Sequence, residues 1–154
     1  MSAQQDLIDS VVGIAPGSPL ARLRAQRPDF VRYTQGYHDA LLNPSGPGGL
    51  SRPERALIAL TTAELSGHAG LAAHYRKLLD ASGAMPDSPR RAALLDHVRR
   101  LVQAPGSATP AHLAALRETG LTATDIVTLS QIVAFVSYQV RVAAGLALLA
   151  AESR

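Results

Sequence analysis

The sequence predicts an all-α helical bundle, and three observations lead to that prediction. Apolar residues make up 47% of the 154 residues but aromatic residues only 4%, so Ala, Leu, Val and Ile must build the core. Ala and Leu favour helices. Pro and Gly clusters divide the chain into segments of helical length. No run alternates apolar and polar residues for long enough to predict a strand.

The chain is predicted to consist of an N-terminal arm followed by one domain. Residues 1–18 form the arm, with one short helix from Asp6 to Val12 that ends at Gly13. Residues 19–154 form a single helical domain. Its first helical stretch, 19–42, can be broken at Pro28, and the Pro-Gly-rich stretch 43–49 is a loop.

Two capping boxes predict where later helices begin. Ser51 and Glu54 have the spacing of a capping box, with Pro53 in the first turn of a helix that runs to about Leu65. Thr122 and Asp125 repeat the pattern at the start of a long helix that ends near residue 151. The helices between them are predicted at residues 68–81, 88–103 and 109–118.

The long C-terminal helix is apolar on almost every side, which is typical of a helix central to a bundle or a subunit interface. A small domain cannot surround thirty residues of helix, so we expect a homo-oligomer. A membrane span is not expected. Gln139 and Arg141 lie in the middle of the apolar run, and a central Arg costs about 2.5–3.5 kcal/mol on insertion scales.

Charge and cysteine content exclude several functions. The net charge is only +3 and the basic residues are scattered, so nucleic-acid binding is not expected. The pairs at 90–91 and 99–100 are predicted to form a solvated helix face. The chain has no Cys, which excludes disulfides, thiolate metal sites and a thiol nucleophile. The N-terminus lacks the basic region of a secretory signal, so a cytoplasmic location is expected.

Three segments carry a resemblance to a known family. They are residues 50–60 (LSRPERALIAL), 66–75 (SGHAGLAAHY) and 125–141 (DIVTLSQIVAFVSYQVR). In this order and spacing they resemble the carboxymuconolactone decarboxylase and alkyl hydroperoxidase D superfamily. The resemblance covers roughly residues 50–148. It implies a helical bundle of the alkyl hydroperoxidase D type that assembles into trimers or hexamers.

The chain departs from the family at its redox centre. The resemblance places the Cys-x-x-Cys pair on Gly67 and Gly70, or its first Cys on His68, and supplies no thiol in either alignment. His74 takes the position of the family's proton-relay His. The relay Glu falls on Ala56, and Glu54 is an imperfect substitute. A dithiol peroxidase is therefore excluded unless a partner supplies the thiols.

The decarboxylase branch of the family implies proton transfer next to a carbonyl, which needs an acid/base His and an anion site. His74 is the candidate acid/base, with Glu54 and Glu64 as candidate carboxylates beside it. Candidate ligand-binding residues for a small carboxylate are Gly67 and His68, at a helix N-terminus, and Tyr138 and Arg141.

Each candidate also has a structural interpretation. His74 lies on the apolar stripe of its helix and can be a hydrogen-bonded core residue. In the structural interpretation Glu54 has no role beyond the capping box, and Arg141 holds a structural ion pair. His68 and His74 lie about 240° apart on an ideal helix, so they do not predict a metal site. No cofactor is predicted.

Three functions stay open from the sequence. The first is a thiol-independent enzyme that performs decarboxylation, isomerisation or a related proton transfer on a small carboxylate through His74. The second is a non-catalytic oligomeric relative that binds a small ligand or a partner. The third is an antioxidant role completed by thiols of another protein. Fold-level resemblance does not decide among them.

Overall fold

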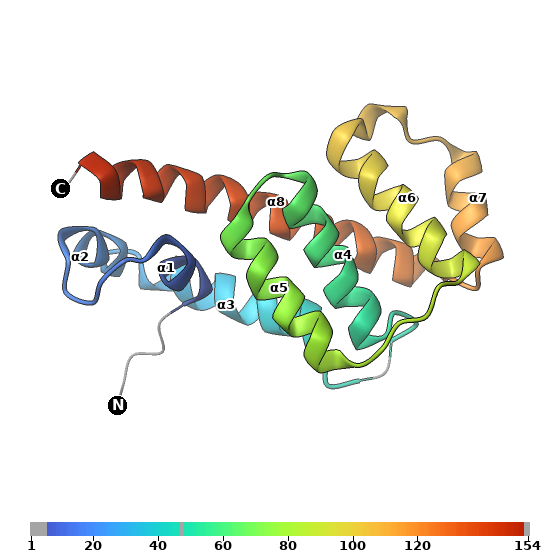
Figure 1. The fold of residues 1–154 in the computed structure, drawn as a ribbon, viewed down its shortest axis with the longest axis horizontal. Helices are drawn as coiled ribbons and strands as arrows, with labels where there is room; N and C mark the ends of the chain where they lie inside the picture. The colour runs from blue at the N-terminus through green and yellow to red at the C-terminus, as the bar shows by residue number, and fades with distance from the viewer. Residues whose placement is uncertain (1–5, 47, 153–154) are drawn as a thin grey trace.

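This computed structural model describes residues 6–46 and 48–152. That part of the chain contains eight α-helices and one short 3-10 helix (Figure 1). The α-helices are α1 (Leu7–Val12), α2 (Pro19–Ala25), α3 (Pro28–Leu42), α4 (Arg52–Leu65), α5 (Ala69–Ser82), α6 (Pro89–Gln103), α7 (Pro110–Glu118) and α8 (Ala123–Glu152), and the 3-10 helix is η1 (Pro105–Ser107). These residues contain no strand, so the all-α prediction is confirmed.

Local sequence accounts for where the helices begin and end. Ser51 and Glu54 form the predicted capping box, in which the Ser51 amide donates to Glu54 Oε2 at 2.7 Å. Thr122 and Asp125 form the second, with the Thr122 amide 2.8 Å from Asp125 Oδ2. The helical stretch 19–42 is broken before Pro28, as predicted.

Helix α8 is the support on which the other helices pack. It runs the length of the molecule behind the α4–α5 pair, with α1 to α3 along one end and α6 and α7 at the other (Figure 1). Helix α4 lies in the centre and packs against α5, α6 and α8. The fully buried residues at this centre include Ile58, Ala59 and Ala63 of α4, Leu71 and Tyr75 of α5, Leu94 and Val98 of α6, and Leu129, Ile132 and Val136 of α8.

Two arginines hold the loop between α3 and α4 against the bundle. Buried Arg55 donates to the carbonyl oxygens of Leu41 at 2.7 Å and Leu50 at 2.9 Å. Arg90 of α6 donates through Nε to Glu54 at 2.5 Å and through Nη2 to the Gly49 carbonyl at 2.5 Å. Arg90 therefore belongs to a partly buried network and not to the solvated face predicted for it.

The N-terminal arm docks onto the bundle through α1, which packs against α8 and α5. Arg24 of α2 fixes α1 by two ion pairs, at 2.5 Å to Asp6 and 2.6 Å to Asp9. A Cβ atom at Gly70 would lie 2.8 Å from Val11 Cγ1. Val11 thus occupies the space that a side chain at position 70 would need.

Replacing Gly49 with Ala is expected to destabilise the fold. The new Cβ would overlap the carboxylate of Asp125, which its hydrogen bonds with Thr122 hold in place. We expect a loss of about 1–3 kcal/mol in the free energy of unfolding, measured by urea denaturation. The control is Gly106→Ala, where no atom lies within 4 Å of the added Cβ. Equal stability of the two variants would contradict the predicted clash.

Candidate functional site

The centre of the candidate site is a pair of imidazole rings from two helices. His74 Nε2 of α5 lies 3.3 Å from His38 Nε2 of α3. The His38 side chain is buried, whereas His74 is partly exposed. A hydrogen bond between two imidazole nitrogens needs one protonated nitrogen and one lone pair, so the protonation states of the two rings are coupled.

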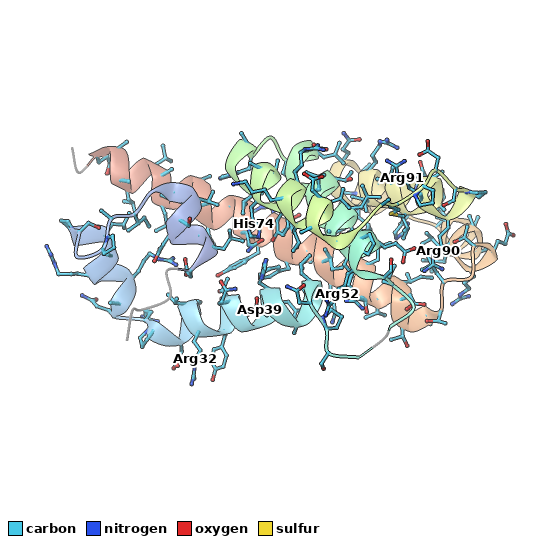
Figure 2. The ribbon with its side chains drawn as sticks, turned by 60° about the horizontal axis from the view of Figure 1, so that its bottom comes forward. Arg32, Asp39, Arg52, His74, Arg90 and Arg91 are labelled. Carbon is cyan, nitrogen blue, oxygen red and sulfur yellow. The ribbon has the colours of Figure 1, made fainter. Side chains whose placement is uncertain are left out.

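An aspartate extends this pair into a chain of three groups. Asp39 Oδ1 lies 2.9 Å from His38 Nδ1, and the carboxylate is mostly exposed. A carboxylate at Nδ1 fixes the proton of His38 on that nitrogen and leaves Nε2 as an acceptor. His74 then donates through its own Nε2. Figure 2 shows Asp39 and His74 facing the same central region, from α3 and α5.

His74 is neutral at physiological pH. Burial, with smaller contributions from the nearby charges of His38 and Lys77, lowers the pKa of His74 to about 4. A neutral imidazole has a lone pair with which to accept a proton. Since Nε2 is engaged with His38, we assign that role to Nδ1.

Aromatic side chains surround the histidine pair. The Tyr75 ring stacks on His38 with centroids 6.1 Å apart and meets His74 edge-on at 5.0 Å. Phe135 of α8 lies 6.5 Å from His38 on another side. These rings exclude water from the inner side of the pair, which explains why burial is the main cause of the lowered His74 pKa.

A second buried polar pair lies beside the first. The Tyr75 hydroxyl donates to Gln139 Oε1, and both side chains are fully buried. Burial raises the pKa of Tyr75, so its phenol stays protonated. Gln139 Nε2 has no hydrogen-bond partner among the described residues. Only the oxygen end of the buried Gln139 amide is therefore hydrogen-bonded among the described residues.

The two candidate carboxylates pair with arginines. Glu54 is bound by Arg90 and by its capping box, and Figure 2 shows Arg90 at the end of the molecule away from His74. Burial alone would raise the pKa of Glu54, but the hydrogen bonds from Arg90 and Ser51 outweigh it and hold the pKa below its usual value. Glu64 accepts a hydrogen bond from Arg76. The polar partner of His74 is instead His38, which in turn contacts Asp39.

The four candidate ligand-binding residues lie in two separate places. His68 is the N-cap of α5, where its Nδ1 accepts from the Leu71 amide at 3.2 Å, and Gly67 precedes it with a positive φ of 71°. Tyr138 and Arg141 lie on exposed positions of α8. The Arg141 guanidinium donates to the Ser137 carbonyl at 2.8 Å.

His38 and Asp39 are the residues that the sequence interpretation missed. A signal for His38 exists, because it lies three and four residues before Leu41 and Leu42 and completes the buried stripe of α3. A polar residue on such a stripe needs a partner. The sequence does not show that this partner comes from α5. In the described residues, no group of three or more His, Asp or Glu side chains is arranged to hold a metal ion.

Comparison with known proteins identifies the family. The family model described as "Carboxymuconolactone decarboxylase family" matches residues 28–104, from the start of α3 to the end of α6. The chain therefore belongs to the carboxymuconolactone decarboxylase family, as its resemblance to the wider superfamily implied. The match includes His38, Asp39 and His74.

A solved structure supports the same assignment. The chain is similar to the alkylhydroperoxidase AhpD core of an uncharacterized peroxidase-related protein from Ralstonia eutropha, with a TM-score of 0.57 and 29% sequence identity. The similarity covers 90% of this chain and 80% of that one. Among curated proteins, none matches the chain.

The stability of the protein is expected to fall as His74 becomes protonated. A histidine of the unfolded chain has a pKa near 6.5, whereas the folded value is about 4. Between these values the unfolded state binds more protons, so the free energy of unfolding decreases as the pH falls from about 6.5 to 4. We expect His74 to contribute about 1–2 kcal/mol of this decrease, allowing for solvent screening.

Urea denaturation at a series of pH values tests this expectation. A His74→Asn variant should show a flatter dependence on pH. The control Gln103→Asn, at an exposed position near the end of α6, changes no titratable group and should keep the slope of the unmodified protein. An unchanged slope in His74→Asn would contradict the assignment of a lowered pKa to His74.

Proposed function

We propose that this protein is a thiol-independent proton-transfer enzyme of the cytoplasm, acting as a decarboxylase or isomerase on a small carboxylate. The observation that carries the proposal is the chain of hydrogen bonds from Asp39 through His38 to His74. A His aligned by a second group, with a pKa below the working pH, is suited to general acid and base catalysis.

The chemistry follows from the protonation states. His74 Nδ1 accepts a proton from a carbon next to a carbonyl, and the electron pair of the broken C–H bond moves into the resulting enolate. The positive charge gained by His74 passes through its Nε2 proton to His38, where the Asp39 carboxylate stabilises it. In isomerisation the proton returns from Nδ1 to another atom of the enolate. In decarboxylation the electron pair of the broken C–CO₂ bond forms the enolate instead, and His74 passes a proton from solvent to the carbon that has lost CO₂.

A carboxylate substrate is supported by the positive charge near His74. The Lys77 ammonium, one turn away on α5, is close enough to lower the His74 pKa. The same charge favours an anion and the enolate that forms from it. Arg141 is less suited to this part of the proposal, because it lies on the exposed side of α8.

A non-catalytic relative is the second candidate function. It is favoured by the rings of Tyr75 and Phe135, which pack against His38 as they would around a structural core residue. In that case His38 and His74 stabilise the contact between α3 and α5, and the protein acts by binding. The antioxidant role needs thiols that this chain lacks, and predicts peroxide turnover only with an added thiol protein.

Hydrogen–deuterium exchange provides a test that does not require the substrate to be known. We expect the protein to exchange the proton next to the carbonyl in at least one member of a panel of small keto acids and lactone carboxylates, followed by NMR in D₂O. His74→Gln should slow this exchange by about 10²- to 10⁴-fold. No exchange with any compound, or equal exchange by His74→Gln, would favour the non-catalytic function.

Asp39 is expected to act as a positioning residue. Asp39→Asn removes the charge that stabilises protonated His38, so the acidic limb of the pH–rate profile should shift to lower pH and the rate fall about tenfold. Asp29→Asn, a mostly exposed acid on the same helix that pairs with Arg32, is the matched control and should leave the profile unchanged. A lower rate with no shift of the profile would indicate that Asp39 has only a structural role.

A further inference from the structure

A cavity that the proposed catalysis does not use is bounded by the end of α3, the loop that follows it and the start of α4. Its volume is about 570 Å³, and its lining includes Asp39, Asn43, Ser45, Gly48 and Arg55. Small-molecule sites combine a concave space of this size with a few polar groups that fix the ligand. Arg55 and Asp39 carry opposite charges, so the chemistry of the cavity depends on what each of them already binds.

Arg55 supplies a fixed positive charge. The residue is 6% exposed, and its Nε and Nη1 donate to the carbonyl oxygens of Leu50 and Leu41, which holds the guanidinium in one orientation. Its third nitrogen, Nη2, has no acceptor in the part of the chain that the structure describes. Nη2 lies beside the lining residue Gly48, where an added Cβ atom would be 2.9 Å from it. The absence of a side chain at Gly48 therefore leaves space beside an unused donor.

No carboxylate forms an ion pair with Arg55 among the described residues. Asp125 and Glu54 act on it from a distance, and both are already bound, Asp125 by Thr122 and Glu54 by Arg90. Burial lowers the pKa of Arg55 more than these two carboxylates raise it. A guanidinium nevertheless stays protonated in proteins. Buried charges are normally paired, so this incompletely compensated cation favours an anionic group of a ligand in the cavity.

Asp39 supplies a negative charge to the same cavity. One carboxylate oxygen, Oδ1, accepts from Gln35 Nε2 at 3.0 Å and lies 2.9 Å from His38 Nδ1. The other, Oδ2, has no hydrogen-bond partner in residues 6–46 and 48–152, and the side chain is 59% exposed. Asp39 and Arg55 form no ion pair with each other in these residues. The cavity therefore offers an unused donor with a positive charge and, separately, an unused acceptor with a negative charge.

We propose that the cavity binds a small zwitterion of the amino acid type, with its carboxylate at Arg55 Nη2 and its ammonium group at Asp39 Oδ2. The inference stands without the proposed catalysis, because it uses the oxygen of Asp39 that does not contact His38. The two charges of the ligand complement the two charges of the cavity wall. The side chains of Asn43 and Ser45 provide neutral donors and acceptors for the remaining polar atoms of such a ligand.

A ligand with a single charge fits the cavity less well. A phosphate or a simple carboxylate would gain the contact with Arg55 but would be repelled by Asp39, and for an amine the attraction and the repulsion are reversed. An apolar molecule would leave the Arg55 donor and the Asp39 acceptor without partners, which costs binding free energy. The opposite charges therefore select for a molecule that carries both, and the distance between them selects for its length.

The first test titrates the protein with amino acids of increasing length and follows the backbone amides by NMR. The series is glycine, 3-aminopropanoate, 4-aminobutanoate and 6-aminohexanoate, and the matched probes with one charge are the corresponding alkyl carboxylates and alkylamines. We expect one member of the series to bind at least about fivefold more tightly than both of its matched probes, because it makes two ionic contacts instead of one. No saturable shift with any zwitterion, or equal binding of the matched carboxylate, would overturn the proposal.

The contact with Arg55 is tested by a pair of glycine variants in the same loop. Gly48→Ala places a methyl group against Arg55 Nη2, so it should weaken binding of the best zwitterion about tenfold. Gly46→Ala is the matched control, because no atom lies within 4 Å of its added Cβ, and it should bind like the unmodified protein. Circular dichroism checks that both variants are folded. Equal binding by the two variants would contradict the assignment of Arg55.

The contact with Asp39 is tested by a pair of acid-to-amide variants on α3. Asp39→Asn removes the negative charge of the cavity, so the preference for the zwitterion over its matched carboxylate should disappear. Asp29→Asn, a mostly exposed acid on the same helix, should retain the preference. A preference that survives Asp39→Asn would place the ammonium group elsewhere and overturn the proposal.

Discussion

The structure depends on one constraint, which is that a helix of thirty residues with almost no charge must be covered along most of its length. Helix α8 packs against α1, α3, α4, α6 and α7 along its inner side. Each of these helices is too short to be stable alone, and each gains its stability from the apolar surface that it buries on α8 or α4. The stability of these helices therefore depends more on their contact with α8 or α4 than on their order along the chain.

The same helix determines the environment of the histidine pair. Phe135 and Gln139 project from one side of α8 toward His38 and Tyr75, so packing of the core also excludes water from the inner side of the two imidazoles. Burial by bundle packing is thus the main cause of the lowered pKa of His74, and the charges of His38 and Lys77 add smaller contributions. If α8 moved away from α3, water would reach the histidine pair and the pKa of His74 would rise.

Local patterns in the sequence were sufficient to predict the helices, because capping boxes and Pro-Gly breaks act within a few residues. The predicted helices beginning at Ser51 and Thr122 are confirmed for this reason. The site was harder to predict, because its contacts join residues far apart in the sequence. His38 meets His74 across 36 positions, and Glu54 meets Arg90 across another 36. The periodicity within one helix cannot predict a contact with another helix. Glu54 and Glu64 are therefore reasonable candidates for the carboxylate beside His74 on sequence grounds, but in the structure they pair with Arg90 and Arg76.

The N-terminal arm occupies the space beside position 70, in the first turn of α5. One of the two alignments with the family places a Cys at position 70, where this chain has Gly and where Val11 of α1 fills the vacant space. Arg24 holds α1 there through Asp6 and Asp9, so a side chain at position 70 would have to displace a helix that is tied by two ion pairs. Restoring the cysteine alone would therefore not restore a peroxidase site. Further along the same helix, α5, His74 contacts His38, which in turn contacts Asp39.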